Sequence, residues 1–358
     1  MKIEAGGNWN GLTGLPTINH STHYYYPANV NAALAAINKA LFPNASNVDK
    51  SAIDSLENAL NQEFLQTESQ VTINTSADFG KAVADAVFAW AETDGYKNAN
   101  NAYTAPIGDG LWKPTPPAMA NPVSPYWGKN RTVIKGSIDN TQPGNPTGYS
   151  SISGSAFFQM AKQVYDASLN PSADQKAMAM FWRDVPGVTS PGHWLSIVQQ
   201  TIRQTKAPLD KAAFAYALTG AAVNDALISC WQTKYHYNLV RPITYIREVM
   251  GYDSWNSFLT TPAHPEYSSA HAVLSMAAAK TMESIFGNIG SFTDHTYDYL
   301  GFAARTYSSF EAIGMEASQS RLYAGIHYQP SIDVGIVQGK KVAENILSIH
   351  PASNAISK

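Results

Sequence analysis

Three short stretches of the chain combine positively charged side chains with histidines. They are CWQTKYHYNLVRP (230–242), PAHPEYSSAHA (262–272) and SQSRLYAGIHYQP (318–330). Taken singly, a lysine or arginine is usually a surface residue and a histidine is usually a packed one. Taken together, Lys234, Arg241 and Arg321 supply three cations, while His271 and His327 supply two imidazoles. Cations of this kind bind the oxygens of a tetrahedral oxyanion, so the set predicts an oxyanion site.

The middle stretch adds a helix start to this set. Ser268 or Ser269 is a suitable N-cap for a helix that runs on to Gly287. The free amides and the positive dipole end of such a helix favour an anion, and His271 would lie in its first turn. One histidine of the site would then bond the central atom, and the other would transfer a proton. A zinc site fits poorly because HExxH is absent and the nine histidines are not grouped with carboxylates.

The elements that position these residues are predicted to be helices. Lys234 and Arg241 are two helical turns apart, so they could share one face of a helix that Pro242 breaks. In 76–95, Ser76 or Asp78 is available as a cap and Gly95 as a stop. Apolar residues recur at helical spacing in further segments. The segments predicted to be helical are 30–42, 48–64, 76–95, 150–169, 172–182, 193–205, 210–237, 268–287, 296–319 and 331–349.

Alternating period-2 runs are almost absent, so the chain is predicted to be all-α. We expect a single domain over 1–358, with N-terminal helices and a long wrapping loop in 1–150. A helical bundle in 151–350 would carry the oxyanion residues. Residues 96–150 are rich in Pro, Gly and Asn, but their Trp112, Tyr126 and Trp127 predict that this stretch packs on a core.

Composition excludes several classes of protein. Hydrophobic residues make up 44% of the chain and charged residues 14%, which is typical of a globular protein. A net charge of −3 gives no case for nucleic acid or an anionic membrane surface as a partner. No apolar run is long enough to predict a membrane span. The single Cys230 excludes an internal disulfide framework. The Asn-, Tyr- and Trp-rich composition favours an exported protein whose signal peptide is absent from this sequence.

These motifs resemble the three-part signature that the PAP2 (type 2 phosphatidic acid phosphatase) enzymes share with the vanadium-dependent haloperoxidases. The matching patterns are K-x6-R-P, S-x-H and S-R-x5-H, formed by Lys234, Arg241, Pro242, Ser269, His271, Ser320, Arg321 and His327. Flanking segments such as VADAVFAWAETDG and NDALISCWQTKYHYNLVRPITYIREV are similar to soluble bacterial haloperoxidase-like members over nearly the whole chain. The resemblance implies the helical bundle of that superfamily, and a homodimer is a possible assembly.

The resemblance also implies a role for each histidine and its neighbours. His327 would bond vanadium in bound vanadate, or attack phosphorus in a phosphatase. His271 would be the acid–base residue. Lys234 would polarise a bound peroxide. The residues implied to hold the oxyanion are Lys234, Arg241, Arg321, the Ser269 hydroxyl and the Ala270 amide, and phosphate could occupy the same site.

The chain departs from the signature at two places. The usual P-S-G-H is here Ser268 to His271, and Ala270 keeps the amide but adds a methyl group to the pocket. The usual Asp four residues after the last histidine is here Ser331, and the nearest acid is Asp333. The resemblance implies that this Asp helps to orient the histidine, and a substitute through Asp333 or a backbone carbonyl is possible.

Two further positions bear on the branch of the superfamily. Trp231 matches a tryptophan near the peroxide in haloperoxidases, and His264 falls where bromoperoxidases carry a second histidine. The alternatives are a core aromatic and a pocket-rim histidine. The favoured interpretation is a haloperoxidase that uses H2O2 to oxidise bromide or iodide. A PAP2-type acid phosphatase acting on phosphate esters through a phosphohistidine, and a binding protein without turnover, remain open.

Overall fold

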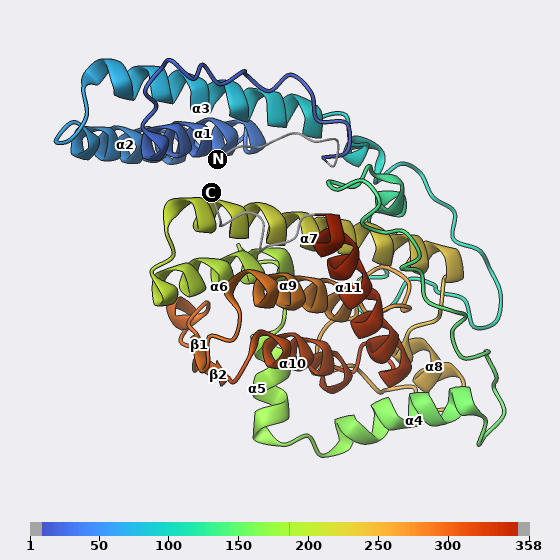
Figure 1. Ribbon diagram of the computed structural model, residues 1–358. Coiled ribbons are helices and arrows are strands. Elements are labelled where there is room, and N and C mark those ends of the chain that lie inside the picture. The colour runs from blue at the N-terminus through green and yellow to red at the C-terminus, as the bar shows by residue number, and fades with distance from the viewer. Residues whose placement is uncertain (1–8, 186, 350–358) are drawn as a thin grey trace. The chain divides into compact units, whose positions relative to one another are not determined.

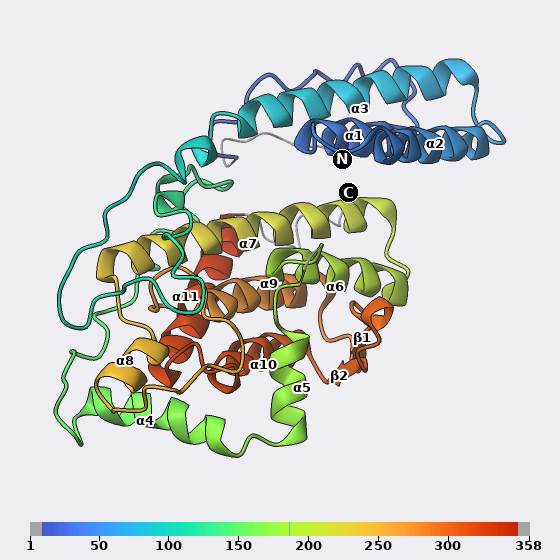
Figure 2. The same ribbon diagram turned by 180° about the vertical axis from the view of Figure 1, so that it is seen from behind.

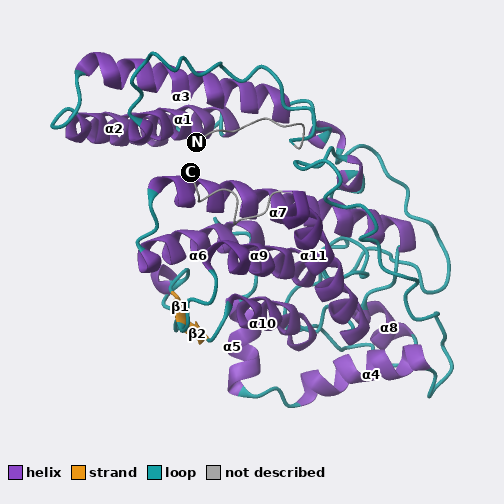
Figure 3. Cartoon of the chain, viewed as in Figure 1, coloured by secondary structure: helices purple, strands orange, loops and turns teal. Residues whose placement is uncertain are grey.

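The computed structural model describes residues 9–185 and 187–349. These residues form eleven α-helices, three short 3₁₀ segments and one two-stranded hairpin (Figure 1). Helix and loop account for everything described except the hairpin (Figure 3), so the all-α prediction is confirmed. Packing divides the chain into two compact units, with the boundary between Tyr96 and Lys97. The single-domain arrangement over 1–358 stays a prediction.

The N-terminal unit contains α1 (Tyr26–Leu41), α2 (Asn47–Phe64) and α3 (Gln70–Ala91). The first and third helices pack closely along each other. Gly80 allows this approach, because a Cβ at that position would lie 2.1 Å from the carbonyl oxygen of Asn29. No side chain of α2 is fully buried, and this helix packs mainly on α1 at the outside of the unit.

The start of α3 differs from the prediction. The hydroxyl of Ser69 accepts from the amide of Thr72 and caps the helix one turn or more before Ser76. Ser76 lies inside the helix, where its hydroxyl accepts from the amide of Tyr25. The predicted caps, Ser76 and Asp78, are therefore wrong, since a better serine cap stands upstream of them.

The C-terminal unit is a helical bundle built around one apolar helix. Its helices are α4 (Ala156–Leu169), α5 (Ala173–Phe181), α6 (Ser190–Thr205), α7 (Leu209–Tyr237), α8 (Pro242–Glu248), α9 (Ala270–Phe286), α10 (Phe310–Tyr323) and α11 (Gln329–Ile349). The central helix is α9, which packs against α7, α10 and α11 (Figures 1 and 2). Burial of 12 of its 17 residues explains why its sequence shows little polar face.

Small residues bring α11 directly onto α9. A Cβ at Gly339 would lie 2.0 Å from the carbonyl oxygen of Val273, and one at Gly335 would lie 3.0 Å from that of Ser269. The amide of Ser269 in turn donates to the carbonyl of Ser331 at 3.1 Å. The glycines of α11 therefore fix the start of α9, where the predicted anion site lies.

The long irregular stretch packs on this bundle. Between Lys97 and Ser155 the described chain contains only short 3₁₀ segments, η1 (Tyr96–Asn98) and η2 (Trp127–Lys129). Trp112 is buried, and the carboxylate of Asp225 on α7 accepts from the amides of Val133 and Ile134. A buried carboxylate with such donors ties the loop to α7.

The end of the predicted segment 210–237 is confirmed, but the expectation that a helix runs on through Arg241 to Pro242 is wrong. α7 ends at Tyr237, because Asn238 takes a left-handed conformation with φ of 47° and its amide returns to the carbonyl of Lys234. Arg241 is the residue before α8, so it does not share a helical face with Lys234. The two cations meet through the turn between the helices instead.

The predicted helix 296–319 is also wrong in its first half. A hairpin occupies this region, with β1 (Phe292–Asp294) and β2 (Arg305–Tyr307) antiparallel and η3 (Asp298–Leu300) between them. Strands of three residues are too short to show period-2 alternation. α10 begins at Phe310, where the hydroxyl of Ser309 accepts from the amide of Ala312.

One described helix, α7, is long and apolar enough to pass a test for a membrane span. However, 61% of its apolar window is buried inside the protein. That burial is what the core helix of a bundle requires, and the feature is weak evidence for a span.

Candidate functional site

The three cationic stretches converge on one cavity of about 700 Å³ in the C-terminal unit. Six of the predicted site residues line it: Trp231, His264, Ala270, His271, Arg321 and His327. Three others, Lys234, Arg241 and Ser269, are fully buried beside this lining. The structure thus brings together all nine side chains that the sequence analysis selected.

Lys234 is held by the loop that precedes α9. Its Nζ donates to the carbonyl oxygens of Pro265, Glu266 and Ser268 at 2.9, 3.0 and 2.6 Å. These three contacts use all three ammonium hydrogens. Burial lowers the pKa of Lys234 to about 8, with Cys230 and Glu266 acting against the further lowering by Arg241. The ammonium is therefore a fixed positive charge at neutral pH that also shapes the loop.

Arg241 connects two of the three stretches. Its Nε donates to the carbonyl of His264 at 2.9 Å, and its Nη1 donates to that of Ile326 at 2.8 Å. Its two terminal nitrogens also approach the rings of His327 and His264, at 3.3 and 3.0 Å. Because a guanidinium only donates, the ring nitrogens facing it must be unprotonated acceptors.

Arg321 reaches the cavity from the end of α10. Its Nε donates to the hydroxyl of Ser320, and its Nη2 donates to the carbonyl of Trp182 at 2.9 Å. Its Nη1 has no hydrogen-bond partner among the described residues, and the side chain lines the cavity. Arg321 is therefore the cation with free donors for an incoming anion.

His327 is oriented by Glu266, which the sequence analysis did not select. The ring Nδ1 lies 2.8 Å from the Glu266 carboxylate, and Nε2 faces Arg241. Since Nε2 must accept from the guanidinium, Nδ1 carries the proton and donates to Glu266. Burial, followed by the charges of Arg241 and Lys234, lowers the pKa of His327 well below its ordinary value. The neutral ring therefore presents an Nε2 lone pair.

Glu266 answers the question raised by the missing aspartate. Its carboxylate also accepts from the amide of Tyr328 and from the hydroxyl of Ser331, the residue that stands in the aspartate's place. Burial raises the pKa of Glu266, while Ser331, Arg241 and Lys234 act to lower it. Asp333, by contrast, is exposed and accepts from Gln329. The expected replacement by Asp333 or a backbone carbonyl is therefore wrong.

His271 lies in the first turn of α9, on the open side of the site. Its Nε2 is 2.9 Å from the carbonyl of Trp182 and 2.8 Å from the hydroxyl of Ser190. A carbonyl only accepts, so Nε2 carries the proton. Burial and then the charge of Arg321 lower the pKa of His271 to about 3, against the opposing charge of Asp184. The ring is thus neutral near pH 7 and leaves Nδ1 as a base with no described hydrogen-bond partner.

Ser190 links His271 to a carboxylate at the mouth of the cavity. The Ser190 hydroxyl and amide both donate to Asp184, at 2.7 and 2.6 Å. Burial acts to raise the pKa of Asp184, but His271 and the two donors from Ser190 lower it overall. Asp184 lies between α5 and α6, Ser190 is the first residue of α6, and neither was selected from the sequence.

Ser269 is the clearest sign that the site is built for a ligand. It occupies the N-cap position of α9, yet its hydroxyl makes no cap hydrogen bond. This oxygen is fully buried and has no partner in the described part of the chain. Ser268 does not cap either, because its hydroxyl donates to Gln338 at 2.6 Å. Ser269 is therefore the N-cap residue, as predicted, but neither serine side chain makes a capping hydrogen bond.

An oxyanion fits this observation. A buried hydroxyl without a partner costs about 1–3 kcal/mol, and an anion oxygen at the helix start would remove that cost. The α9 start, the free Nη1 of Arg321 and the two buried cations supply hydrogen bonds and positive charge around one point. The donor set thus suits vanadate or phosphate.

Trp231 and His264 form one wall of the cavity. Their rings pack at a tilt of 46° with centroids 5.1 Å apart. The indole Nε1 of Trp231 is buried and has no partner within the described residues. Burial and then the charges of Lys234 and Arg241 lower the pKa of His264 well below its ordinary value, so this wall is uncharged.

Comparison with known proteins places the chain in a family. A model described as the VCPO second helical-bundle domain matches residues 214–352. The crystal structure of a bacterial vanadium-dependent iodoperoxidase is similar with a TM-score of 0.85 and 32% identity, covering 96% of this chain and 84% of that one. A search among curated proteins finds no match.

Two structures of bacterial vanadium-dependent chloroperoxidase share the fold. The holo form has a TM-score of 0.71 at 17% identity, covering 92% of this chain and 83% of that one. The apo form has a TM-score of 0.73 at 16% identity, covering 97% and 88%. A helical bundle with buried cations and oriented neutral histidines around one cavity is the arrangement that an oxyanion site requires. With the iodoperoxidase match, the chain belongs to the vanadium haloperoxidase superfamily, which is related to the PAP2 enzymes.

Proposed function

We propose that this protein is a vanadate-dependent haloperoxidase that uses H2O2 to oxidise bromide or iodide. The similarity to a bacterial iodoperoxidase supports both the halide chemistry and vanadate as the bound group. When bound, vanadate supplies a Lewis-acidic centre that activates peroxide. The described residues then determine how the group is held and where protons move.

His327 would bond the oxyanion centre through Nε2, which Glu266 keeps unprotonated and whose lone pair would exchange its contact with Arg241 for that bond. The free Nη1 of Arg321, the Ser269 hydroxyl and the Ala270 amide would donate to its oxygens. Lys234 would contribute its charge while its hydrogen bonds stay with the loop. Excess positive charge in a buried site favours a multiply charged anion.

His271 would accept a proton from H2O2 as it binds. Its Nδ1 is unprotonated, because Trp182 holds the proton at Nε2 and its pKa is about 3. An unprotonated ring beside the cavity favours a base at this place, and the similarity to the iodoperoxidase carries the proposal. A phosphatase needs an acid there to protonate the leaving alcohol. The Trp231–His264 wall would be the place where halide approaches.

The first test is halogenation of a cyclic diketone with bromide or iodide and H2O2, after incubation of the purified protein with orthovanadate. We expect activity that requires vanadate and falls when phosphate is added. His327→Ala should abolish it and lose tight orthovanadate binding, whereas His236→Ala, outside the cavity lining, should keep both. Orthovanadate binding by His327→Ala at parental affinity would show that the site is assigned wrongly.

One observation favours the related alternative of a PAP2-type acid phosphatase. Glu266 orients His327 as the usual aspartate would, so the lack of that aspartate does not argue against a phosphohistidine. Hydrolysis of p-nitrophenyl phosphate by the vanadate-free protein, with no halogenation after vanadate loading, would select this function. Vanadate binding without either activity would identify a binding protein.

A further inference from the structure

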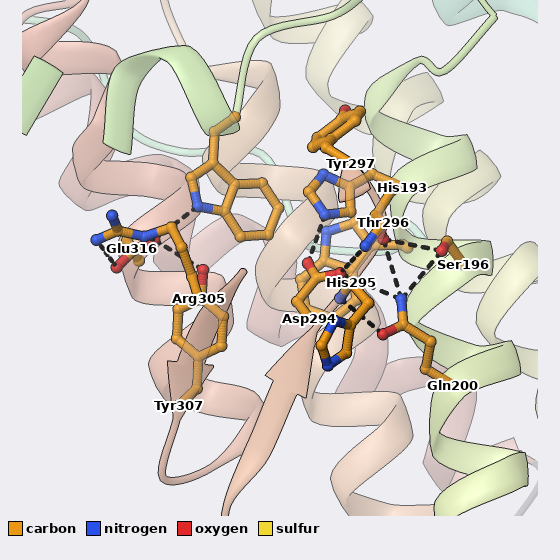
Figure 4. A network of polar contacts seen from close by, with 12 residues as sticks. His193, Ser196, Gln200, Asp294, His295, Thr296, Tyr297, Arg305, Tyr307 and Glu316 are labelled. Atoms are coloured by element: carbon orange, nitrogen blue, oxygen red, sulfur yellow. Dashed lines mark hydrogen bonds and ion pairs between the residues drawn. The ribbon is translucent and has the colours of Figure 1, made fainter. Parts of the chain in front are cut away.

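The β1–β2 hairpin carries two opposite charges in register (Figure 4). Asp294, at the end of β1, pairs with Arg305, at the start of β2. The Asp294 carboxylate is fully buried and lies 2.6 Å from Nε2 of His193 on α6. Burial acts to raise the pKa of Asp294, but the hydrogen bond and charge of His193 hold that pKa below its ordinary value. The carboxylate is thus an ionised anchor for His193.

The ring of His193 is enclosed by aromatic side chains. It stacks on Trp182 with centroids 4.4 Å apart and 20° between the planes. It meets Tyr297 and Phe181 edge-on at 4.8 and 5.4 Å. In Figure 4, His193 lies between Tyr297 and Asp294. Packed aromatic rings at these distances fix one another's orientation.

Arg305 contacts Glu316, which in turn accepts a hydrogen bond from the indole nitrogen of Trp182. The indole Nε1 of Trp182 donates to Glu316 at 3.0 Å. Arg305 binds both oxygens of that carboxylate, at 2.6 and 2.8 Å, as Figure 4 shows for this pair. One residue of the register pair therefore fixes the face of Trp182, through His193, and its partner fixes the edge.

Trp182 in turn holds two residues of the oxyanion site. Its carbonyl oxygen accepts from Nε2 of His271 and from Nη2 of Arg321, each at 2.9 Å. Trp182 follows the last residue of α5, so this carbonyl is not engaged by the helix ladder. Its direction depends on the backbone of a residue whose side chain the hairpin has fixed.

We propose that His193 is a positioning residue, which acts with Asp294 to fix Trp182 so that the Trp182 carbonyl aims His271 and Arg321 at the oxyanion. His193 itself makes no bond to the reactants. The kinetic consequence rests on the proposed halide oxidation, but the effect on the His271 ring does not. Displacement of a catalytic group by about 1 Å costs on the order of a hundredfold in rate.

The test compares His193→Gln with His295→Gln. The glutamine amide at 193 can still donate to Asp294 but removes the stacked ring. His295 is the matched control, because it is an exposed histidine on the same hairpin that pairs with exposed Asp298 at 2.9 Å. Asp294→Asn is the second variant, since it keeps the shape of the side chain and an oxygen acceptor.

Two readouts separate positioning from simple structural support. In ¹⁵N NMR of histidine-labelled protein, His271 should carry its proton at Nε2 in the parent and become a mixture of tautomers in His193→Gln. In halide oxidation, kcat should fall about ten- to hundredfold, with the KM for halide unchanged. Asp294→Asn should shift both readouts in the same direction, and His295→Gln should shift neither.

A folded His193→Gln protein with parental His271 shifts and parental kcat would overturn the proposal. So would a lower unfolding temperature with unchanged His271 shifts, because a purely structural role gives that result. If the parent protein oxidises no halide, the proposed function fails. A changed His271 tautomer in His193→Gln would still support the positioning role.

Discussion

The two histidines of the site are built differently. His327 is 2% exposed and is held by a carboxylate on one nitrogen and a guanidinium near the other. His271 lies against the cavity, and its held nitrogen contacts a carbonyl and a hydroxyl that leads to the exposed carboxylate of Asp184. The first arrangement suits a permanent bond to the oxyanion. The second suits proton exchange with the cavity and the solvent beyond it.

This difference teaches that neighbouring groups assign the roles of two chemically identical side chains. Arg241 donates to Nε2 of His327, so that nitrogen carries no proton. The Trp182 carbonyl accepts from Nε2 of His271, so that nitrogen does carry one. The atoms left for chemistry are therefore Nε2 on one ring and Nδ1 on the other. Breaking one support at a time should show which functions depend on it.

The largest effect is expected from Glu266→Ala. Removal of a buried carboxylate that accepts from His327, Tyr328 and Ser331 should cost about 3–5 kcal/mol of unfolding free energy. Orthovanadate affinity should fall about ten- to hundredfold, because the His327 ring loses its orientation. Urea unfolding and calorimetric titration would measure the two effects.

Asp333→Ala is the matched control for that variant. The side chain is exposed and contacts Gln329, so both measurements should stay near the parental values. The opposite ranking, with Asp333 more important than Glu266 for vanadate affinity, would mean that the sequence pattern outweighs the observed contact.

Much of this site could be predicted from the sequence, and the exceptions have physical causes. The cations and histidines of the three stretches could be selected because charged residue types at fixed spacing survive without knowledge of the fold. Glu266 could not, since its partners follow 61 to 65 residues later and only folding brings them together. The one available signal was an acid between the two histidines of PAHPEYSSAHA.

A helix or strand could be predicted when its hydrophobic pattern repeats over many residues. The helices α7, α9 and α11 were found from apolar spacing, whereas strands of three residues at 292–294 and 305–307 leave no pattern. The end of α7 at Tyr237 was predicted, but a continuation through Arg241 was not excluded, because Asn238 takes the left-handed conformation, which its sequence permits but does not require. The role of Trp182 could not be predicted, because it contacts the site through its backbone carbonyl oxygen, which every residue type has.

The next largest effects are expected at two neighbouring serines, one in vanadate binding and the other in stability. Ser269→Ala should weaken orthovanadate binding about tenfold or more, since a hydrogen bond to a charged group is lost. Its unfolding temperature should not fall, because the hydroxyl has no partner among the described residues. Ser268→Ala should lower stability by about 1–2 kcal/mol, since Gln338 loses its partner. Thermal unfolding with and without vanadate separates the two; equal stability losses would contradict the assignment.

The pH dependence of stability should report how His271 is buried. Its pKa is about 3 in the folded chain and about 6.5 when unfolded, so the unfolded state binds more protons between these values. Unfolding free energy should therefore decrease as pH falls from about 6.5 towards 3. His271→Gln should remove up to about 1.4 kcal/mol per pH unit of this slope. His295→Gln should leave the slope unchanged, and a slope equally insensitive to His271→Gln would contradict a neutral buried ring.

The smallest effect is expected at Asp184, which touches the open side of the site. Its negative charge raises the pKa of His271, so Asp184→Asn should lower that pKa further. The acid limb of the pH–rate profile should then move to lower pH, because His271 stays a base over a wider range. Loss of the Ser190 acceptor should reduce kcat about three- to tenfold as the relay weakens.

Asp298→Asn, an exposed acid on the hairpin, is the control. An acid limb that moves upward would place the active proton on a group other than His271, and the contrast between the two histidines would fail at that point.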